Sequence, residues 1–376
     1  MNGGRCASPV LQLLSAAFSQ QPAQSQQKIT RYVVEGILLY FLVLNTVRSR
    51  DMLRRVLWTL VLAGAFMGSL SVYQAVTKSY HNSLGGLAQV ADADENGDHL
   101  RQAGPIGEKN RYAQIMIVLL PLGVFLYRSE KTAWVRRAAA ACCAPILAGT
   151  LLTYSRGAGV ALGLLLMAMV VLRVLRLKQV MGYAAAALLV TLLIVPGYVQ
   201  RFTSLAGLTE VEAGSRGNAD TSLRGRATEM LAALRIFLDH PLLGVGPGQT
   251  PLYIAEYGNR DGFRRLQGNW RGHNLYLEEL ADTGLIGFAG LAAILAFTLH
   301  QLWRVRQGAS ITPDAAELAT GLLLAVLAYL FTAMFLHLSY QRYFWLLMTV
   351  AGIGIRVLRP ESPSASPAEQ PLPARG

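Results

Sequence analysis

Long apolar runs separated by polar stretches restrict this chain to a narrow set of folds. Of its 376 residues, 53% are hydrophobic and only 15% are charged. A helix needs roughly 20 apolar residues to cross a bilayer core of ~30 Å, and open sheets cannot cross lipid. The runs lack the alternation of a membrane barrel, so they predict an all-α, polytopic membrane bundle. About nine spans are predicted, over residues 32–47, 56–77, 112–127, 133–153, 157–172, 179–197, 274–299, 315–337 and 343–358.

The connections between these runs sort by charge. Basic residues fall on every second connection, as the positive-inside rule requires of cytoplasmic loops. This explains the net charge of +12 without nucleic acid as a partner. The opposite connections, predicted to lie outside, are 78–111, 154–156, 198–273 and 338–342. The basic residues are Arg48, Arg50, Arg54, Arg55, Arg128, Lys131, Arg136, Arg137, Arg173, Arg176, Lys178, Arg304, Arg306, Arg356 and Arg359.

The chain divides into a membrane domain and two flanking segments. Residues 1–31 form a polar N-terminal segment, which either hides a short helix or is a remnant of upstream spans, because the first span begins outside. Residues 32–358 form the membrane domain, with the large outside loop at 198–273. Residues 359–376, rich in Pro, Ser and Ala, are expected to be a disordered cytoplasmic tail. The three cysteines form no credible disulfide framework.

Two outside loops are long enough to hold structure of their own. Loop 78–111 contains an acidic run from Asp92 to Asp98, which resembles a calcium loop but has Ala103 where the bidentate Glu belongs. A solvated acidic loop, without metal, is the favoured interpretation; an Asp-x-Asp cation site is the other alternative. In loop 198–273, an amphipathic helix is expected from about Leu223 to Asp239. Its apolar face is predicted to hold Leu223, Ala227, Met230, Leu231, Leu234, Ile236 and Phe237.

Arginine and histidine supply the candidate chemistry. Loop 198–273 holds nine Arg and no Lys, and two short outside turns carry Arg156 and Arg342 against the charge rule. Arg342 is also explained if it merely snorkels to the interface. Guanidinium groups clamp phosphate oxygens, and neutral imidazole accepts a proton from an attacking hydroxyl. His273, where the loop enters an apolar helix, thus predicts chemistry on a phosphate-bearing lipid, although a local hydrogen-bonding role explains that one residue equally well.

Four stretches resemble the bacterial O-antigen ligases, within the superfamily of ligases and polymerases that move glycans from undecaprenyl pyrophosphate. The stretches span roughly residues 100–290 and are Arg101–Asn110 with the following Leu-Leu-Pro121, Thr153–Ala158, Leu223-Arg224 with His240–Gly248, and His273–Gly287. Family members usually have about three more spans near the N-terminus, which agrees with the first span beginning outside.

The resemblance implies a GT-C-type glycosyltransferase of the inner membrane that works on the periplasmic face. Its donor would be an undecaprenyl-pyrophosphate-linked glycan and its acceptor a sugar hydroxyl of lipid A–core, with inversion and without metal or other cofactor. By motif, Arg156 and Arg224 would grip the pyrophosphate and His273 would act as base or positioner, so these three are the expected catalytic residues. Arg226 is nearly equivalent to Arg224, and the other residues expected to bind substrate are Arg101, Tyr154 and Asn274.

Other functions remain open at this point. An O-antigen or exopolysaccharide polymerase would use the same donor with a growing glycan as acceptor, and a protein-glycan ligase would use a third acceptor. A transporter of lipid-linked glycan belongs to a different class. Transport needs charges along a pathway through the membrane midplane, and the predicted spans are nearly free of central charges. The arginines instead gather at one face, which favours surface chemistry.

Overall fold

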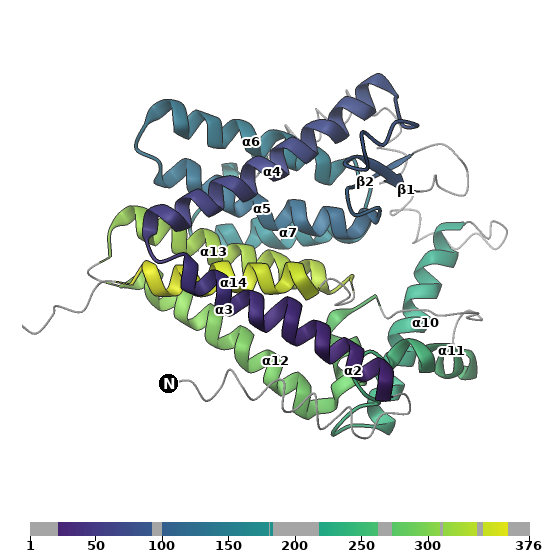
Figure 1. Ribbon diagram of the computed structural model, residues 1–376. Helices are drawn as coiled ribbons and strands as arrows, with labels where there is room; N and C mark the ends of the chain where they lie inside the picture. The colour runs from purple at the N-terminus through teal and green to yellow at the C-terminus, as the bar shows by residue number, and fades with distance from the viewer. Residues whose placement is uncertain are drawn as a thin grey trace, which may run out of the picture.

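Apolar helices run side by side through most of the molecule (Figure 1). The computed structural model describes residues 22–91, 100–179, 181–182, 218–261, 273–308, 311–336 and 341–359. The helices are α2 (Pro22–Arg31), the π-helix η1 (Tyr32–Leu38), α3 (Leu39–Thr46), α4 (Arg50–Thr77), α5 (Lys109–Ser129), α6 (Ala133–Leu151), α7 (Arg156–Val171), α10 (Asn218–Asp239), α11 (Thr250–Asp261), α12 (Leu275–Gln307), α13 (Pro313–Ala333) and α14 (Gln341–Val357). Two short antiparallel strands, β1 (Gln89–Ala91) and β2 (Arg101–Gly104), pair beside them.

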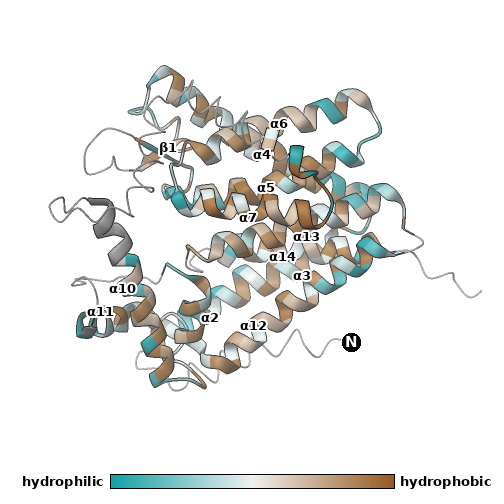
Figure 2. Ribbon diagram, turned by 180° about the vertical axis from the view of Figure 1, so that it is seen from behind, coloured by the Kyte–Doolittle hydropathy of each residue, from teal (hydrophilic) through white to brown (hydrophobic). Residues whose placement is uncertain are grey.

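The helical membrane bundle predicted from the apolar runs is confirmed in its general form. Five helices among the described residues are long and apolar enough to cross a bilayer, at Ser25–Thr46, Arg50–Thr77, Lys109–Ser129, Leu275–Gln307 and Pro313–Ala333. The predicted spans at 133–153, 157–172 and 343–358 correspond to the shorter or less apolar helices α6, α7 and α14. Most of the span predicted at 179–197 lies outside the described residues. Figure 2 shows hydrophobic colour along the bundle helices and hydrophilic colour toward their ends.

The first helical segment begins earlier than predicted. The polar helix α2 continues without interruption into η1 and α3, and the apolar span runs from Ser25 rather than from residue 32. A helix therefore does lie within the segment predicted at 1–31, as one of the two alternatives had it, and it continues directly into the first span. The polar side chains of Ser25 and Lys28 have buried partners, which hydropathy alone does not predict.

Helices α5 and α13 form the centre of the bundle. Both are largely buried, and α5 is packed by α4, α6, α7 and α13. Tyr112, Met116 and Phe125 on α5 are among the largest fully buried side chains. Gly68 of α4 has no side chain, which allows that helix to lie directly against the backbone carbonyl of Pro145 in α6. This tight core fixes the helix ends on which the polar groups stand.

The basic connections gather at one end of the bundle, as the charge pattern predicts. Each contact there joins segments distant in sequence: Arg50 Nε donates to Val357 O (3.1 Å), Arg356 to Val47 O (2.6 Å), Arg306 to Leu172 O (2.8 Å), and Arg128 pairs with Glu317 (2.6 Å). The sheet, α10 and α11 lie at the other end (Figure 1). The bundle therefore has a basic end and an opposite end that carries the sheet and the loop helices.

Candidate active site

Helix α10 carries a buried stripe that includes one carboxylate. Gly225, Thr228, Glu229, Ala232, Ala233 and Ile236 repeat at helical spacing and are buried. The predicted amphipathic helix is thus confirmed, and its predicted apolar face is right in part, because Ile236 is buried and Met230, Leu231 and Phe237 are half-buried, whereas Ala227 and Leu234 are exposed. Small side chains form the stripe because α10 packs closely on α11 and α12. Glu229, only 1% exposed, is a charged group placed where a core residue is expected.

The turn after α10 is fastened to α12 by backbone hydrogen bonds. Val245 N donates to Ala281 O (2.9 Å), Gly246 N to Asp282 O (2.9 Å), and Leu285 N to Pro241 O (2.8 Å). At Gly284 the backbone leaves the helical conformation, with φ at 65°, and this kink frees the carbonyls that the turn uses. A Cβ on Gly284 would strike Leu242, and one on Gly244 would strike Asp282. The two glycine-containing motifs at 240–248 and 273–287 are therefore two sides of one joint.

Asp282 holds the same joint together through its side chain. Its carboxylate, 1% exposed, accepts from Gly248 N (2.7 Å), from Thr250 N (2.9 Å) and Oγ1 (2.6 Å), and from Lys28 Nζ (2.6 Å). Gln249 Nε2 also donates to Ser25 Oγ at 3.0 Å. These contacts bind α2 to the start of α11 and to α12. The joint fixes the position of α10, and hence of its polar residues, relative to the start of α12.

His273 stands directly before α12 and contacts the buried carboxylate of α10. Its Nδ1 lies 2.5 Å from Glu229 Oε2, with the imidazole 30% exposed and the Glu229 side chain 2% exposed. An ionised carboxylate only accepts, so Nδ1 donates and the neutral ring presents Nε2 as an acceptor. The pair joins residues 44 positions apart. The contact with Glu229 orients the imidazole.

Arg226, three residues before Glu229, brings a second cation to this place. Burial lowers the pKa of the Arg226 guanidinium; the charges of Glu229 and Glu108 raise it, and the positive charge of Arg156 lowers it further. An arginine stays protonated in any case, so these effects matter because they report which groups lie near one another. They show that Arg226 on α10 and Arg156 on α7 lie within electrostatic range of each other. Within the described residues neither guanidinium has a hydrogen bond or ion pair.

The N-termini of α5 and α7 are joined beside these cations. Glu108 caps α5 by accepting from Asn110 N (3.0 Å) and Arg111 N (2.8 Å). Ser155 caps α7 by accepting from Ala158 N (3.3 Å), and its hydroxyl donates to Asn110 Oδ1 (2.8 Å). Arg156 is the first residue of α7, so a guanidinium stands at the positive end of a helix dipole. A cation in that position attracts anions, as free helix N-termini do.

The remaining predicted residues are placed as follows. Asn274 is the N-cap of α12, since its Oδ1 accepts from Tyr276 N (2.9 Å) and Leu277 N (3.2 Å). Tyr154 occupies the turn before α7 with φ at 49°. Arg101 begins β2, whose next residue, Gln102, donates from its backbone to Leu152 O (3.0 Å). Arg224 lies on α10, but its side chain is outside the described residues.

Arg342 and the acidic run 92–98 are the other two features that the sequence singled out. Arg342 forms a bidentate pair with Glu35, at 2.6 Å for both contacts, which gives it a structural role between α14 and η1. The acidic run 92–98 lies outside the described residues. Among the residues that the structure describes, no group of three His, Cys, Asp or Glu is arranged to hold a metal ion. The arrangement near His273 offers two cations and an oriented imidazole.

The comparisons with known proteins agree with the motifs. The family model described as O-Antigen ligase matches residues 139–292. No curated protein matches the chain. The matched region contains Arg156, Arg226, Glu229 and His273, whereas Glu108 and Arg101 precede it. The family indicates a multi-pass membrane enzyme of the ligase and polymerase type. Residues 139–292 are therefore similar to the O-antigen ligase family, which supports the resemblance found in the motifs.

Proposed function

We propose that this protein is an O-antigen ligase, which transfers a glycan from undecaprenyl pyrophosphate to a sugar hydroxyl of lipid A–core at the periplasmic face of the inner membrane. The observation that carries the proposal is that Arg156 and Arg226 lie within electrostatic range of each other beside the His273–Glu229 pair, with no hydrogen bond or ion pair to the described residues. Arg156 repels Arg226, and the carboxylates of Glu229 and Glu108 offset burial and this repulsion only in part, since the pKa of Arg226 is lowered overall. A pyrophosphate, with several negative oxygens, removes that repulsion and accepts from both forks.

The donor would bind at the start of α7. Arg156 and Arg226 would hold its diphosphate, and the positive end of the α7 dipole would add to the attraction. Because negative charge increases on the diphosphate as the glycosidic bond breaks, the same groups stabilise the leaving group more in the transition state than in the ground state. The chemistry therefore needs no metal ion. Arg226, rather than Arg224, is the arginine of α10 that we assign to this role.

The acceptor would be activated by His273. Its Nε2 takes the proton of the acceptor hydroxyl as the oxygen attacks the anomeric carbon, and the bond from that carbon to the diphosphate oxygen breaks with its electron pair on the oxygen. Attack opposite the leaving group inverts the anomeric centre. Glu229 stabilises the imidazolium that forms, as a carboxylate oriented on Nδ1 can do. Glu229 is thus a positioning residue that acts through His273.

Reconstitution tests this assignment. Purified protein in liposomes, given undecaprenyl-pyrophosphate glycan and lipid A–core, should produce capped lipopolysaccharide in the presence of excess chelator. Longer lipid-linked glycans without capped product would instead establish a polymerase, which uses the same donor. Lack of turnover until a divalent cation is added would overturn the metal-free mechanism.

A further inference from the structure

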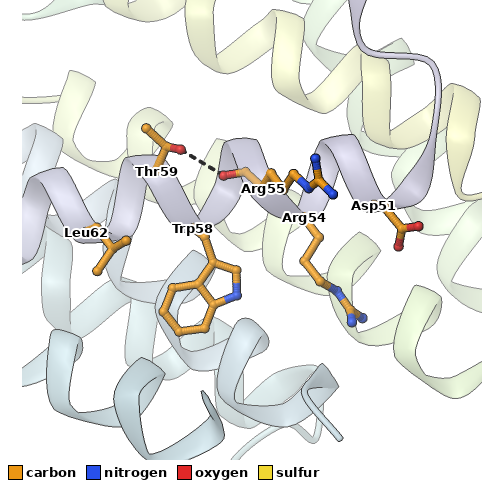
Figure 3. Close-up of a pocket in the computed structure, with 6 residues that line it drawn as sticks. All are labelled: Asp51, Arg54, Arg55, Trp58, Thr59 and Leu62. Carbon is orange, nitrogen blue, oxygen red and sulfur yellow. Dashed lines mark hydrogen bonds between the residues drawn. The ribbon is translucent and has the colours of Figure 1, made fainter. Parts of the chain in front are cut away.

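A groove on α4 lies at the basic end of the bundle, remote from the candidate active site. It has a volume of about 470 Å³ and is lined by Asp51, Arg54, Arg55, Trp58, Thr59 and Leu62. Figure 3 shows these side chains along one side of the helix. That volume falls in the ~300–1,000 Å³ range of small-molecule sites. None of these residues takes part in the proposed transfer.

The lining changes from charged to apolar along the helix. Asp51, Arg54 and Arg55 are near its start, Trp58 and Thr59 follow, and Leu62, 52% exposed, completes the series. Seven residues of helix separate Arg55 from Leu62, which corresponds to roughly 10 Å. A glycerophospholipid has the same order over a similar depth, from headgroup to acyl chain. Trp is also the residue that membrane proteins place at this interface.

The charges around the groove favour a particular kind of headgroup. Arg54 is shared between Glu130 and Asp314, at 3.7 Å each, and Lys131 acts electrostatically on Asp314. A lipid headgroup near the groove therefore meets carboxylates as well as cations, which disfavours a purely anionic lipid. Within the described residues, Asp51 and Arg55 have no ion-pair partner, although both are exposed and one turn apart. The groove thus presents one available cation and one available carboxylate.

We propose that this groove binds a zwitterionic glycerophospholipid whose headgroup contains a phosphate and a primary amine. The phosphate contacts Arg55 and the edge of Arg54, and the ammonium contacts Asp51. The glycerol region lies by Thr59 and Trp58, whose indole Nε1 is held by Glu130 at 2.9 Å, so that the ring is fixed as a wall of the groove. The acyl chain continues past Leu62 into the bilayer.

Lipid retention tests the proposal without any assay of transfer. The full-length protein is purified from nanodiscs of equal phosphatidylethanolamine, phosphatidylglycerol and phosphatidylcholine, and the retained lipids are quantified by native mass spectrometry. Wild type should be enriched in phosphatidylethanolamine. Arg55→Ala should reduce this enrichment about three- to fivefold, in keeping with one exposed ion pair. Arg137→Ala removes the same charge from an exposed position on α6, outside the groove, and should leave the enrichment unchanged.

Asp51→Asn separates the two headgroup types by the sign of its effect. The amine-specific contact predicts that this variant loses phosphatidylethanolamine and gains phosphatidylglycerol. A merely anionic site would gain both lipids. Equal retention of the three lipids by wild type, or a preference for phosphatidylglycerol that Asp51→Asn only strengthens, would overturn the proposal. Both substituted residues are exposed, so the variants should fold.

Discussion

Arginine serves different purposes at the two ends of this bundle. At the basic end, Arg128 pairs with Glu317, and Arg306 and Arg356 donate to backbone carbonyls where helices finish. At the opposite end, Arg156 and Arg226 approach each other without an ion pair among the described residues. The first three arginines therefore hold segments together, whereas Arg156 and Arg226 keep their charge available. Availability, rather than the number of arginines, distinguishes a candidate anion site from a positively charged loop.

The largest effect should come from removing the imidazole. His273→Ala should lower transfer by about 10²–10⁴-fold, because it removes the proposed base. His300→Ala, on the basic-end half of α12, is the matched control and should transfer normally. The measurement is product formation in proteoliposomes at equal protein incorporation. Wild-type turnover by His273→Ala would remove the imidazole from the mechanism.

Removing Arg156 or Arg226 should lower the rate of transfer nearly as much as removing His273. Arg156→Ala and Arg226→Ala should each lower transfer by about 10²–10³-fold, since each removes a preorganised group that stabilises the leaving charge. Arg224→Ala should have a much smaller effect. Kinetics with the lipid-linked donor check this order. If Arg224→Ala proves more damaging than Arg226→Ala, the assignment on α10 is reversed.

Glu229 should act through the imidazole and not through substrate binding. Glu229→Gln keeps the size of the side chain but removes its charge, so we expect kcat to fall at least about tenfold while KM for the donor changes little. Glu256→Gln on α11 is a surface control, because among the described residues Glu256 forms an ion pair only with Arg260 on its own helix. A fall in thermal stability with unchanged kcat would show that Glu229 is structural.

Asp282 lies at the same end as Arg156 and Arg226, but it is a structural residue, because its carboxylate is buried and paired. Asp282→Ala strands Lys28 and the donors of Gly248 and Thr250, and should lower the free energy of unfolding by about 3 kcal/mol. Thermal unfolding in detergent measures this. Unchanged stability would mean that the joint between α10 and α12 is held by its backbone bonds alone.

The smallest effect is expected at the basic end. Arg128→Ala breaks an exposed pair with Glu317, so it should cost no more than about 1 kcal/mol of stability and leave transfer within twofold. The same proteoliposome assay and unfolding curve apply. A large loss of transfer would contradict the division of roles between the ends.

Sequence alone predicts the bundle well because hydropathy and charge report directly on the bilayer. It predicts His273 and Arg156 from the change between polar loop and apolar helix and from a basic residue in a short turn. It does not find Glu229, which resembles any polar residue of an amphipathic helix and becomes buried only when α10 meets α12. The start of the first span was placed too late, at residue 32, for the same reason. Lys28 is polar, but in the fold it is paired with Asp282.

The choice between Arg224 and Arg226 also needed the fold. Motif spacing favoured Arg224, whose side chain lies outside the described residues. We assign the role to Arg226, because its guanidinium lies within electrostatic range of Arg156.

The interlocking glycines at 244 and 284 have a practical consequence for engineering. At each glycine the opposing segment leaves no space for a side chain. Neither the turn after α10 nor the kink of α12 can therefore be redesigned alone. A chimera that grafts the external helices of a relative onto this bundle must carry both halves, from the end of α10 through the kink of α12. Only then would the residues of the grafted helix lie in the correct positions relative to His273.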